Sequence, residues 1–304
     1  MDHQLKLSDA LHGKRIKIFT RSFSLELYRQ AAALFENVVN IPTVRLTDQT
    51  ADGYFYTMLQ DLECDIAINI DEDAFVVNPQ AMLDLAEFVV IHGYANAGCP
   101  DGGGGCPRAG NPLVTNPFFN VFNLELIRTK FTSKKDIQAF QYESVKQEMK
   151  AKFPMDMLQS TYNFELLDYE PYYPFFFWLA YNFKTYYLPS QKHQDGISTI
   201  LYNHQNQPIC YHAWMARFYS MSSFVVRFIQ KGAGKQKLRI DNLIRESYAV
   251  RGVQVLSFSV GDRLMFRFDK LVRWCIKVPQ RVMGWPRKWA KWYRRWERKR
   301  QGAI

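Results

Sequence analysis

The sequence has few cysteines and lacks any long apolar run. Its five cysteines are an odd number scattered over 304 residues, which excludes the paired framework of a small disulfide-rich secreted domain. No stretch approaches the roughly 20 apolar residues that span a bilayer. Residues 1–13 also lack the apolar core of a signal peptide. We therefore expect a protein of the reducing cytoplasm without a membrane-spanning helix.

Acidic residues are scarce at one end of the chain. The net charge is +10, from 39 Lys and Arg against 29 Asp and Glu. Residues 263–304 hold 14 of the basic residues and only two acids, so the other 262 residues carry a net charge of −2. This asymmetry predicts a near-neutral globular body followed by a basic segment whose partner is an anionic surface.

Strand-like and helix-like segments alternate through the body. Apolar runs predict strands over 14–20, 42–46, 65–71, 89–93, 118–124 and 184–188, and helical spacing predicts helices over 25–35, 54–62, 80–88, 134–151 and 172–181. The pair Asn78-Pro79 is a suitable start for the third of these helices. Such alternation predicts an α/β fold with a mostly parallel sheet flanked by helices.

Residues 98–112 contain six glycines and three prolines, so no regular element fits them. The segment is either a mobile lid over a site or a long surface loop. We favour the lid, because long loops in compact domains tend to be functional.

Three acids, Asp71, Glu72 and Asp73, end the predicted strand over 65–71. The strand reads as buried, and its carboxyl end lies where open α/β sheets keep their ligand crevice. Asp71 and Asp73 would point to one side of an extended backbone, where two carboxylates need a cation between them. The pattern predicts Mg²⁺ or Mn²⁺ completed by substrate phosphates. Acids that merely face solvent are the alternative.

Two further places carry candidate site residues. Asp168 and Glu170 precede the aromatic helix over 172–181, near the positive end of its dipole. His212 lies in an aromatic segment near the end of the body. The alternatives are an ordinary helix cap for the acids and a structural histidine for His212.

Together these features resemble nucleotide-sugar glycosyltransferases of the GT-A fold, of the bacterial surface-glycan type, over about residues 14–219. They follow the family's order: a first strand with a nucleotide-contacting turn, a second strand ending in an acid, an Asp-x-Asp element, a late acidic pair before a helix, and a downstream histidine. The late pair is Asp168-Tyr169-Glu170 in place of Glu-Asp, which leaves the base open. No subfamily is indicated.

The resemblance implies a catalytic domain over 14–220, a connecting region packed on it over 221–262 and a basic tail over 263–304. It implies a hexosyltransferase that uses a nucleoside-diphosphate sugar and a glycan or lipid-linked glycan acceptor, as in polysaccharide or lipopolysaccharide biosynthesis. Glu170 is the first choice for the base and Asp168 the second, while a retaining reaction would need neither. The implied binding residues are, for the nucleotide, Thr20, Arg21, Asp48 and Asp71, and, for Mn²⁺ or Mg²⁺, Asp71, Asp73 and His212.

Four tryptophans share one face of a predicted helix in the tail, at i, i+4, i+7 and i+11: Trp285, Trp289, Trp292 and Trp296. A tryptophan face beside many cations suits the surface of an anionic bilayer. We expect peripheral binding to the inner face of the cell membrane and no nucleic-acid partner, since the body is slightly acidic. The rivals are a nucleic-acid-binding protein that uses this tail, a metal-dependent phosphohydrolase, and a fold that has lost catalysis.

Overall fold

The computed structural model describes residues 5, 7–36, 41–47, 49–103, 105–216, 219 and 233–272. The chain divides into two compact units, Met1–Leu256 and Ser257–Ile304. Asp48, predicted to bind the nucleotide, lies outside the described residues. So do the four tail tryptophans, Trp285, Trp289, Trp292 and Trp296.

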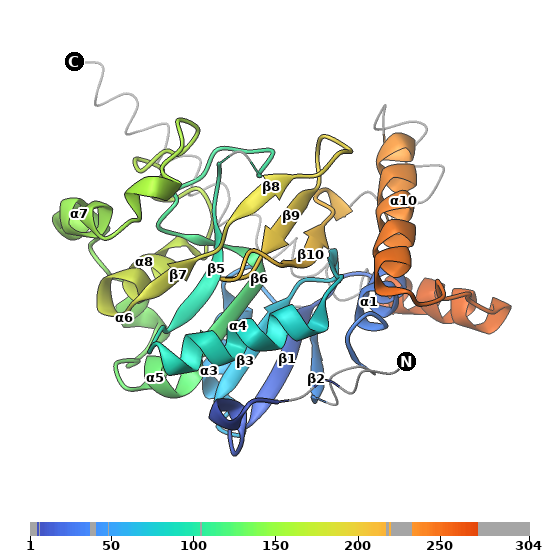
Figure 1. Cartoon of the computed structure of the whole chain (residues 1–304), viewed down its shortest axis with the longest axis horizontal. Coiled ribbons are helices and arrows are strands. Elements are labelled where there is room, and N and C mark those ends of the chain that lie inside the picture. Colours follow the sequence, from blue (N-terminus) through green and yellow to red (C-terminus); the bar gives the residue numbers. More distant parts are fainter. Residues whose placement is uncertain are drawn as a thin grey trace. The chain divides into compact units, whose positions relative to one another are not determined.

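A six-stranded sheet forms the centre of the first unit (Figure 1). β6 runs antiparallel to both of its neighbours, and all other pairs are parallel, so five strands share one direction. This confirms the predicted α/β class with a mostly parallel sheet. In spatial order the strands are β2 (Thr43–Leu46), β1 (Ile16–Arg21), β3 (Ile66–Ile70), β6 (Thr115–Asn123), β5 (Asn96–Pro100) and β7 (Thr185–Tyr187).

Helices cover both faces of this sheet, because successive strand residues point to opposite sides. One face carries Ile16, Ile18 and Ile66, in one apolar cluster with α4 (Pro79–Ile91). The other face carries Phe19, Ala67 and Phe122, in a cluster with α3 (Gly53–Gln60), α5 (Leu124–Arg128) and α8 (Tyr173–Asn182). Figure 1 shows α4 crossing in front of the strands.

Three expectations about elements differ from the structure. Residues 98–100, where no regular element was expected, belong to β5. The expected strand over 89–93 is wrong: α4 continues to Ile91, and β5 begins only at Asn96. Val89 is β-branched, but it extends the buried helical face of Leu85 and Ala86, and this packing overrides the propensity. The expected helix over 134–151 is two helices, α6 (Lys134–Gln138) and α7 (Tyr142–Ala151).

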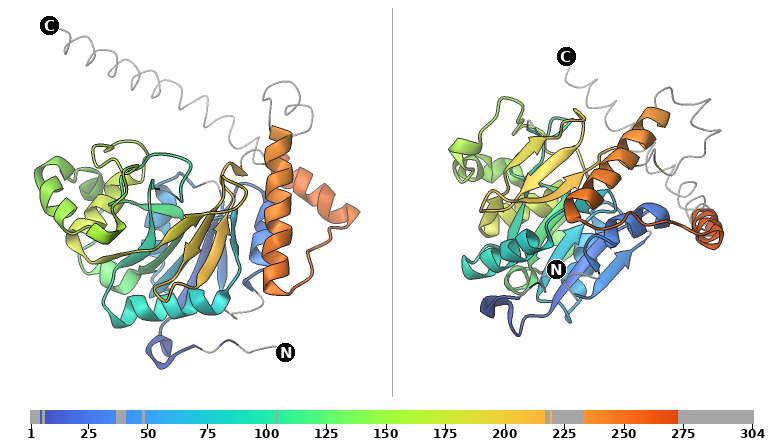
Figure 2. Two further views of the ribbon diagram at one scale, coloured as in Figure 1. Left: turned by 45° about the horizontal axis from the view of Figure 1, so that its top comes forward. Right: turned by 45° about the vertical axis from the view of Figure 1, so that its right-hand side comes forward.

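A second, antiparallel sheet has the order β4-β10-β9-β8. Its strands are β4 (Ala74–Val76), β8 (Ser190–Lys192), β9 (Thr199–Tyr202) and β10 (Pro208–His212). α1 (Leu25–Ala32) and α10 (Ala233–Arg251) share an apolar cluster with this sheet, through residues such as Leu27, Phe75 and Tyr248. Both views of Figure 2 show α10 alongside these strands. Two short 3₁₀ helices, Asp9–Leu11 and Met155–Met157, complete the described elements of this unit.

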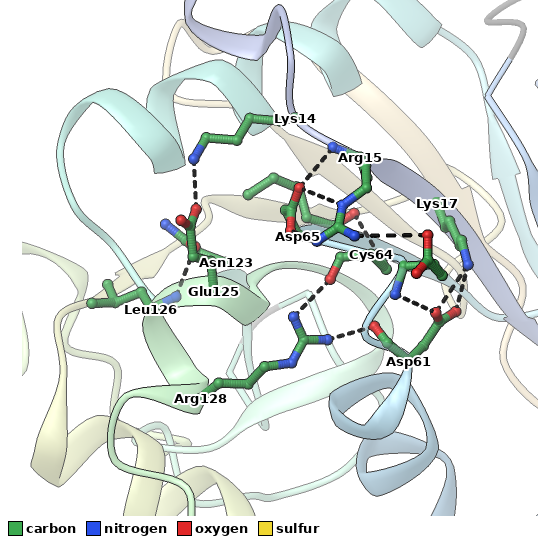
Figure 3. Close-up of polar contacts among 12 residues, drawn as sticks. Lys14, Arg15, Lys17, Asp61, Cys64, Asp65, Asn123, Glu125, Leu126 and Arg128 are labelled. Atoms are coloured by element: carbon green, nitrogen blue, oxygen red, sulfur yellow. Dashed lines mark hydrogen bonds and ion pairs between the residues drawn. The ribbon is translucent and has the colours of Figure 1, made fainter.

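A polar cluster closes the amino-terminal edge of β1 and β3 (Figure 3). Arg15 pairs with Asp65 at 2.6 Å, and Lys17 pairs with Asp61 at 2.8 Å. Arg128 of α5 donates to the carbonyl oxygens of Leu59, Asp61 and Cys64, around the end of α3. These contacts fix the starts of β1 and β3 relative to α3 and α5.

The described part of the second unit contains a helix over 260–272. Among the described residues of the whole chain, no helix combines the length and apolar character that crossing a bilayer requires.

Candidate functional site

The acidic residues 71–73 form the link between the two sheets. They follow β3 of the central sheet and precede β4 of the second sheet. The backbone N–H of Ala74 donates to the carbonyl of Asp71 at 3.0 Å, so the segment is a tight turn. The expectation of an extended backbone over these residues is therefore wrong. In the turn, each of the three carboxylates meets different neighbours.

Asp73 faces His212 across the second sheet. β10 pairs with β4 so that His212 lies opposite Ala74, one residue beyond Asp73. The His212 Nε2 lies 3.4 Å from the Asp73 Oδ2, and the side chains are 6% and 14% exposed. Burial opposes ionisation of Asp73, but His212 outweighs it and lowers the pKa of Asp73. The His212 ring also stacks on Phe118 at 4.2 Å between centroids, which fixes its plane.

Asp71 lies beside Arg21, the last residue of β1. Burial raises the pKa of Asp71 to about 7, although the positive charge of Arg21 works against this rise. The Arg21 guanidinium carbon lies 5.2 Å from the centre of the Tyr54 ring and 5.1 Å from that of Phe23. β1 and α3 therefore place a cation and an aromatic ring next to a carboxylate at the carboxyl edge of the sheet.

Glu72, the middle residue of the acidic turn, has a structural task that the sequence does not reveal. Its Oε2 accepts hydrogen bonds from the Ser22 hydroxyl at 2.8 Å and from the backbone N–H groups of Phe23 and Ser24 at 2.9 and 2.8 Å. These bonds tie the turn after β1 to the acidic turn after β3. Burial raises the pKa of Glu72 to about 7, and the hydrogen bonds from Ser24 and Ser22 oppose this rise.

Four of the predicted site residues each keep a buried polar atom that has no hydrogen-bond partner among the described residues. These atoms are the Thr20 Oγ1, the Arg21 Nε, the Asp71 Oδ1 and the His212 Nδ1. Buried polar atoms are nearly always hydrogen-bonded in folded proteins, because an unpaired one costs about 1–3 kcal/mol. Thr20 and Arg21 are successive strand residues and point to opposite faces of β1, whereas Arg21 and Asp71 lie next to each other, so this pair is the place that a polar ligand would complete.

The acidic turn and His212 do not amount to a complete metal site by themselves. Within the residues that the structure describes, no three His, Cys, Asp or Glu side chains converge closely enough to hold a metal ion. Asp73 and His212 form a pair, and the remaining ligands of a cation would have to come from elsewhere.

The other predicted acid, Glu170, belongs to a second cluster that is centred on Arg108. Arg108 Nη1 donates to Glu170 at 2.7 Å, and Nη2 donates to the hydroxyl of Tyr172 at 2.6 Å and to Asp101 at 3.2 Å. Burial works against the charge of Arg108, but Tyr172, Asp101 and Glu170 outweigh it and raise its pKa. Asp168, two residues before Glu170, is exposed.

The glycine-rich segment presents Arg108 from a tightly folded turn. A Cβ on Gly102, whose φ is +92°, would lie 2.6 Å from the backbone nitrogen of Gly110, so both glycines are needed for this close approach. Asp101 is fully buried and also accepts hydrogen bonds from Asn116 and Tyr173, both at 2.8 Å.

Sequence reasoning missed Asp101 and Arg108. The available signal was that they are the sole acid and the sole base within 98–112.

Comparisons with known proteins find only weak similarity. No family model and no curated protein matches it. Among solved structures, it is similar to A197 from STIV, with 13% identity and a TM-score of 0.30 over 64% of this chain and 93% of that one. It is also similar to a glycosyltransferase involved in the glycosylation of the major capsid of PBCV-1, with 13% identity and a TM-score of 0.27 over 49% and 79% of the two chains. Both TM-scores are too low to establish a shared fold.

Proposed function

We propose that this chain is a metal-dependent glycosyltransferase that moves a hexosyl group from a nucleoside-diphosphate sugar to a glycan or lipid-linked glycan acceptor. The observation that carries the proposal is the pair of Arg21 and Asp71 at the carboxyl edge of a mostly parallel sheet, each with a buried polar atom that has no hydrogen-bond partner among the described residues. That edge is where open α/β sheets bind nucleotides. A cation suits a diphosphate, an aromatic ring suits a nucleobase, and a carboxylate suits the hydroxyl groups of a ribose.

The residues present fit a divalent cation. The carboxylate of Asp73 and the imidazole of His212 are of the ligand types that Mn²⁺ accepts, and the Asp71 Oδ1 has no hydrogen-bond partner within the part of the chain that the structure describes. Asp73 and His212 would hold the ion, and diphosphate oxygens would supply the ligands that the described residues lack. When bound, the ion would neutralise the charge that develops on the departing diphosphate.

The protein's own groups would organise the rest of the site. Arg21 places a positive charge next to Asp71, and Glu72 fixes the backbone of 22–24 relative to the acidic turn. Arg108 holds Glu170 in a defined position through a 2.7 Å hydrogen bond. Glu170 remains our first choice for the group that takes the acceptor's proton, and Asp168 our second. Such a base contributes about 10²–10⁴-fold to a rate.

A thermal-shift panel tests the donor site. We expect one nucleoside diphosphate among those of uridine, guanosine, thymidine, cytidine and adenosine to raise the melting temperature only with Mn²⁺ or Mg²⁺. Asp73→Asn should abolish that metal-dependent rise, because it removes the negative charge that pairs with the ion. Asp84→Asn, on the surface of α4, is the matched control and should behave like the parent. A metal response that survives in Asp73→Asn would refute the assignment.

Product analysis separates transfer from hydrolysis. A phosphohydrolase would split the diphosphate of the nucleotide sugar that binds best into a nucleoside monophosphate and a sugar 1-phosphate, whether or not an acceptor is added. A glycosyltransferase would release an intact nucleoside diphosphate, and the release would accelerate with a suitable acceptor. Formation of the monophosphate and the sugar 1-phosphate with no sugar transfer would favour the rival enzyme.

For localisation, we propose that the second unit binds the cytoplasmic face of an anionic membrane. Along the helix over 260–272, four apolar side chains fall on one face and are well exposed, and Arg263, Arg267 and Lys270 lie beside them. The four are Val260, Leu264, Phe268 and Leu271, with exposed fractions of 76%, 59%, 66% and 57%. An apolar face with cations at its border fits the interface of an anionic bilayer, where a lipid-linked acceptor would be found.

A further inference from the structure

The turn that follows β10 has an unusual backbone. Trp214 and Met215 adopt φ angles of +50° and +60°, in the left-handed region, although neither is glycine. A residue with a side chain costs about 1–2 kcal/mol in this region, and two in succession are rare. Such strain persists only where the surroundings impose it, and it is concentrated at binding and catalytic sites. The turn begins two residues after His212, which already belongs to the proposed site.

A single arginine from α10 holds this turn in place. Arg239 Nη2 donates to the carbonyl oxygens of Ala213 and Trp214 at 2.5 and 3.0 Å. Its Nη1 donates to Asp195 at 3.0 Å and to the Ser198 hydroxyl at 2.5 Å, and the side chain is only 10% exposed. The guanidinium is thereby held on one side by the Asp195 carboxylate and the Ser198 hydroxyl, and on the other side it binds the backbone carbonyls of the strained turn.

The turn presents the Trp214 side chain between the two clusters of the site. Its ring centre lies 4.4 Å from that of His212, and its Nε1 donates to Thr199 at 2.8 Å. On the other side, the Arg108 guanidinium carbon lies 5.7 Å from the indole centre. Trp214 therefore touches both the residue paired with Asp73 and the residue paired with Glu170, and it is only half-buried.

The geometry points to Trp214 as the platform for the sugar ring of the donor, with Arg239 as the residue that positions it. This inference rests on the proposed function. In an inverting glycosyl transfer with Glu170 as the base, the sugar lies between the departing diphosphate and the incoming hydroxyl. The diphosphate belongs at Asp73 and His212 and the hydroxyl at Glu170, and Trp214 joins these two places. The face of an indole suits the C–H-rich face of a hexopyranose, and its N–H is already satisfied by Thr199.

Calorimetric titration of Trp214 variants tests the platform. The probes are UDP, GDP, dTDP, CDP and ADP, and their hexose conjugates, each with Mn²⁺ and the full-length protein. In Trp214→Ala, the affinity for the conjugate should fall about 10–100-fold, which is about 1.4–2.8 kcal/mol, while the affinity for the bare diphosphate changes less than about twofold. Trp214→Phe, which keeps a ring, should recover most of the loss. Tyr94→Ala, a half-buried aromatic at the other edge of the sheet, is the control.

Arg239 should affect the ratio of the affinity for the sugar conjugate to the affinity for the bare diphosphate, although it does not contact the sugar. In Arg239→Lys and Arg239→Met the two carbonyls lose their shared donor, so the conjugate should again weaken relative to the bare diphosphate. A loss of stability alone would not change this ratio. Because Arg239 acts through Trp214, the double variant Arg239→Met with Trp214→Ala should lose no more than Trp214→Ala alone.

The outcomes distinguish this inference from the function on which it rests. If no diphosphate binds the parent with Mn²⁺, the proposed function fails and the platform with it. If a diphosphate and its conjugate bind the parent, but Trp214→Ala keeps the parent's ratio of affinities, then only the platform is refuted.

Discussion

At the scale of single residues, Asp71 and Asp65 show how burial and partners give two carboxylates opposite properties. Both flank β3, one at each end. Asp65 pairs with Arg15, whose hydrogen bond lowers the pKa of Asp65 to about 2. Burial raises the pKa of Asp71 to about 7, and no described residue forms a hydrogen bond with its Oδ1. The amino-terminal carboxylate therefore stabilises the fold, whereas the carboxyl-terminal one is a cost that a ligand would relieve.

Replacing Asp71 should therefore stabilise the unliganded protein. An acid whose pKa is raised by folding destabilises the fold above that pKa, and the loss disappears as the pH falls toward the unfolded value. We expect Asp71→Asn to gain about 1–3 kcal/mol at pH 8 without metal, and the gain to shrink below pH 7. Urea unfolding from pH 5.5 to pH 8 measures both the gain in stability and its decrease at low pH. The same variant should lose nucleoside diphosphate binding, as expected of a site residue that is not needed for folding.

Asp65→Asn provides the comparison of opposite sign. An acid whose pKa is lowered by folding stabilises the fold above its unfolded value, and this contribution is lost as the pH falls from about 4 to about 2. We expect the substitution to destabilise the protein at neutral pH and to leave nucleotide binding intact. If Asp71→Asn proves as destabilising as Asp65→Asn, Asp71 is a structural residue.

At the scale of elements, Arg128 joins α5 to the end of α3. It donates four hydrogen bonds to backbone carbonyls of 58–64, where the last turn of a helix leaves oxygens without partners. Arg128→Met keeps the length of the side chain and removes every donor. We expect a loss of about 2–4 kcal/mol in the free energy of unfolding.

Lys130→Met is the matched control for Arg128. This lysine makes one exposed hydrogen bond to a carbonyl, so its loss should cost less than about 0.5 kcal/mol. Neither variant should change the metal-dependent thermal shift with nucleotide, because both lie at the edge opposite the acidic turn. A change in that shift in Arg128→Met would show that the two edges are coupled.

The elements that the sequence predicts well are those with strong local signals. β3 is an apolar run broken only by Asn69, β6 contains Phe118, Phe119 and Phe122, and Asn78 caps α4 by accepting from Ala81 at 3.0 Å, as the Asn-Pro pair indicates. β4 and β8 have only three residues each, too few for a periodic pattern. The sequence therefore did not predict the second sheet, and it did not predict the contact between Asp73 and His212 that this sheet creates. That contact depends on the pairing of β10 with β4, which lie far apart in the sequence.

The residues of the candidate site also divide into those with a local signal in the sequence and those without one. Asp71 could be found from its place after a readable strand, whereas Thr20 and Arg21, the last residues of β1, were implied only by the family resemblance. Arg108 and Trp214 were missed, because Arg108 lies in a glycine-rich segment, where its being the sole base was the one signal, and Trp214 lies in a strained turn. Neither segment has periodicity, and both are fixed by distant partners, namely Glu170 and Arg239.

At the scale of the whole molecule, the charge is divided between a body and a tail. A body of net charge −2 does not by itself favour an anionic surface, whereas residues 263–304 carry a net charge of +12. Each basic residue near an anionic bilayer contributes about 1 kcal/mol, and the contribution falls with ionic strength. Membrane binding should therefore depend on the second unit and on salt, and donor binding on neither.

Vesicle flotation of the full-length protein measures this division. We expect flotation with vesicles containing phosphatidylglycerol and little with pure phosphatidylcholine, with a loss at high salt. The double variant Leu264→Glu with Phe268→Glu should weaken flotation at least about tenfold, because it places acids on the apolar face of the helix over 260–272. Leu62→Glu with Ile91→Glu, at exposed apolar positions of the body, should float like the parent. Tighter binding to RNA than to anionic vesicles would instead favour a nucleic-acid partner for the tail.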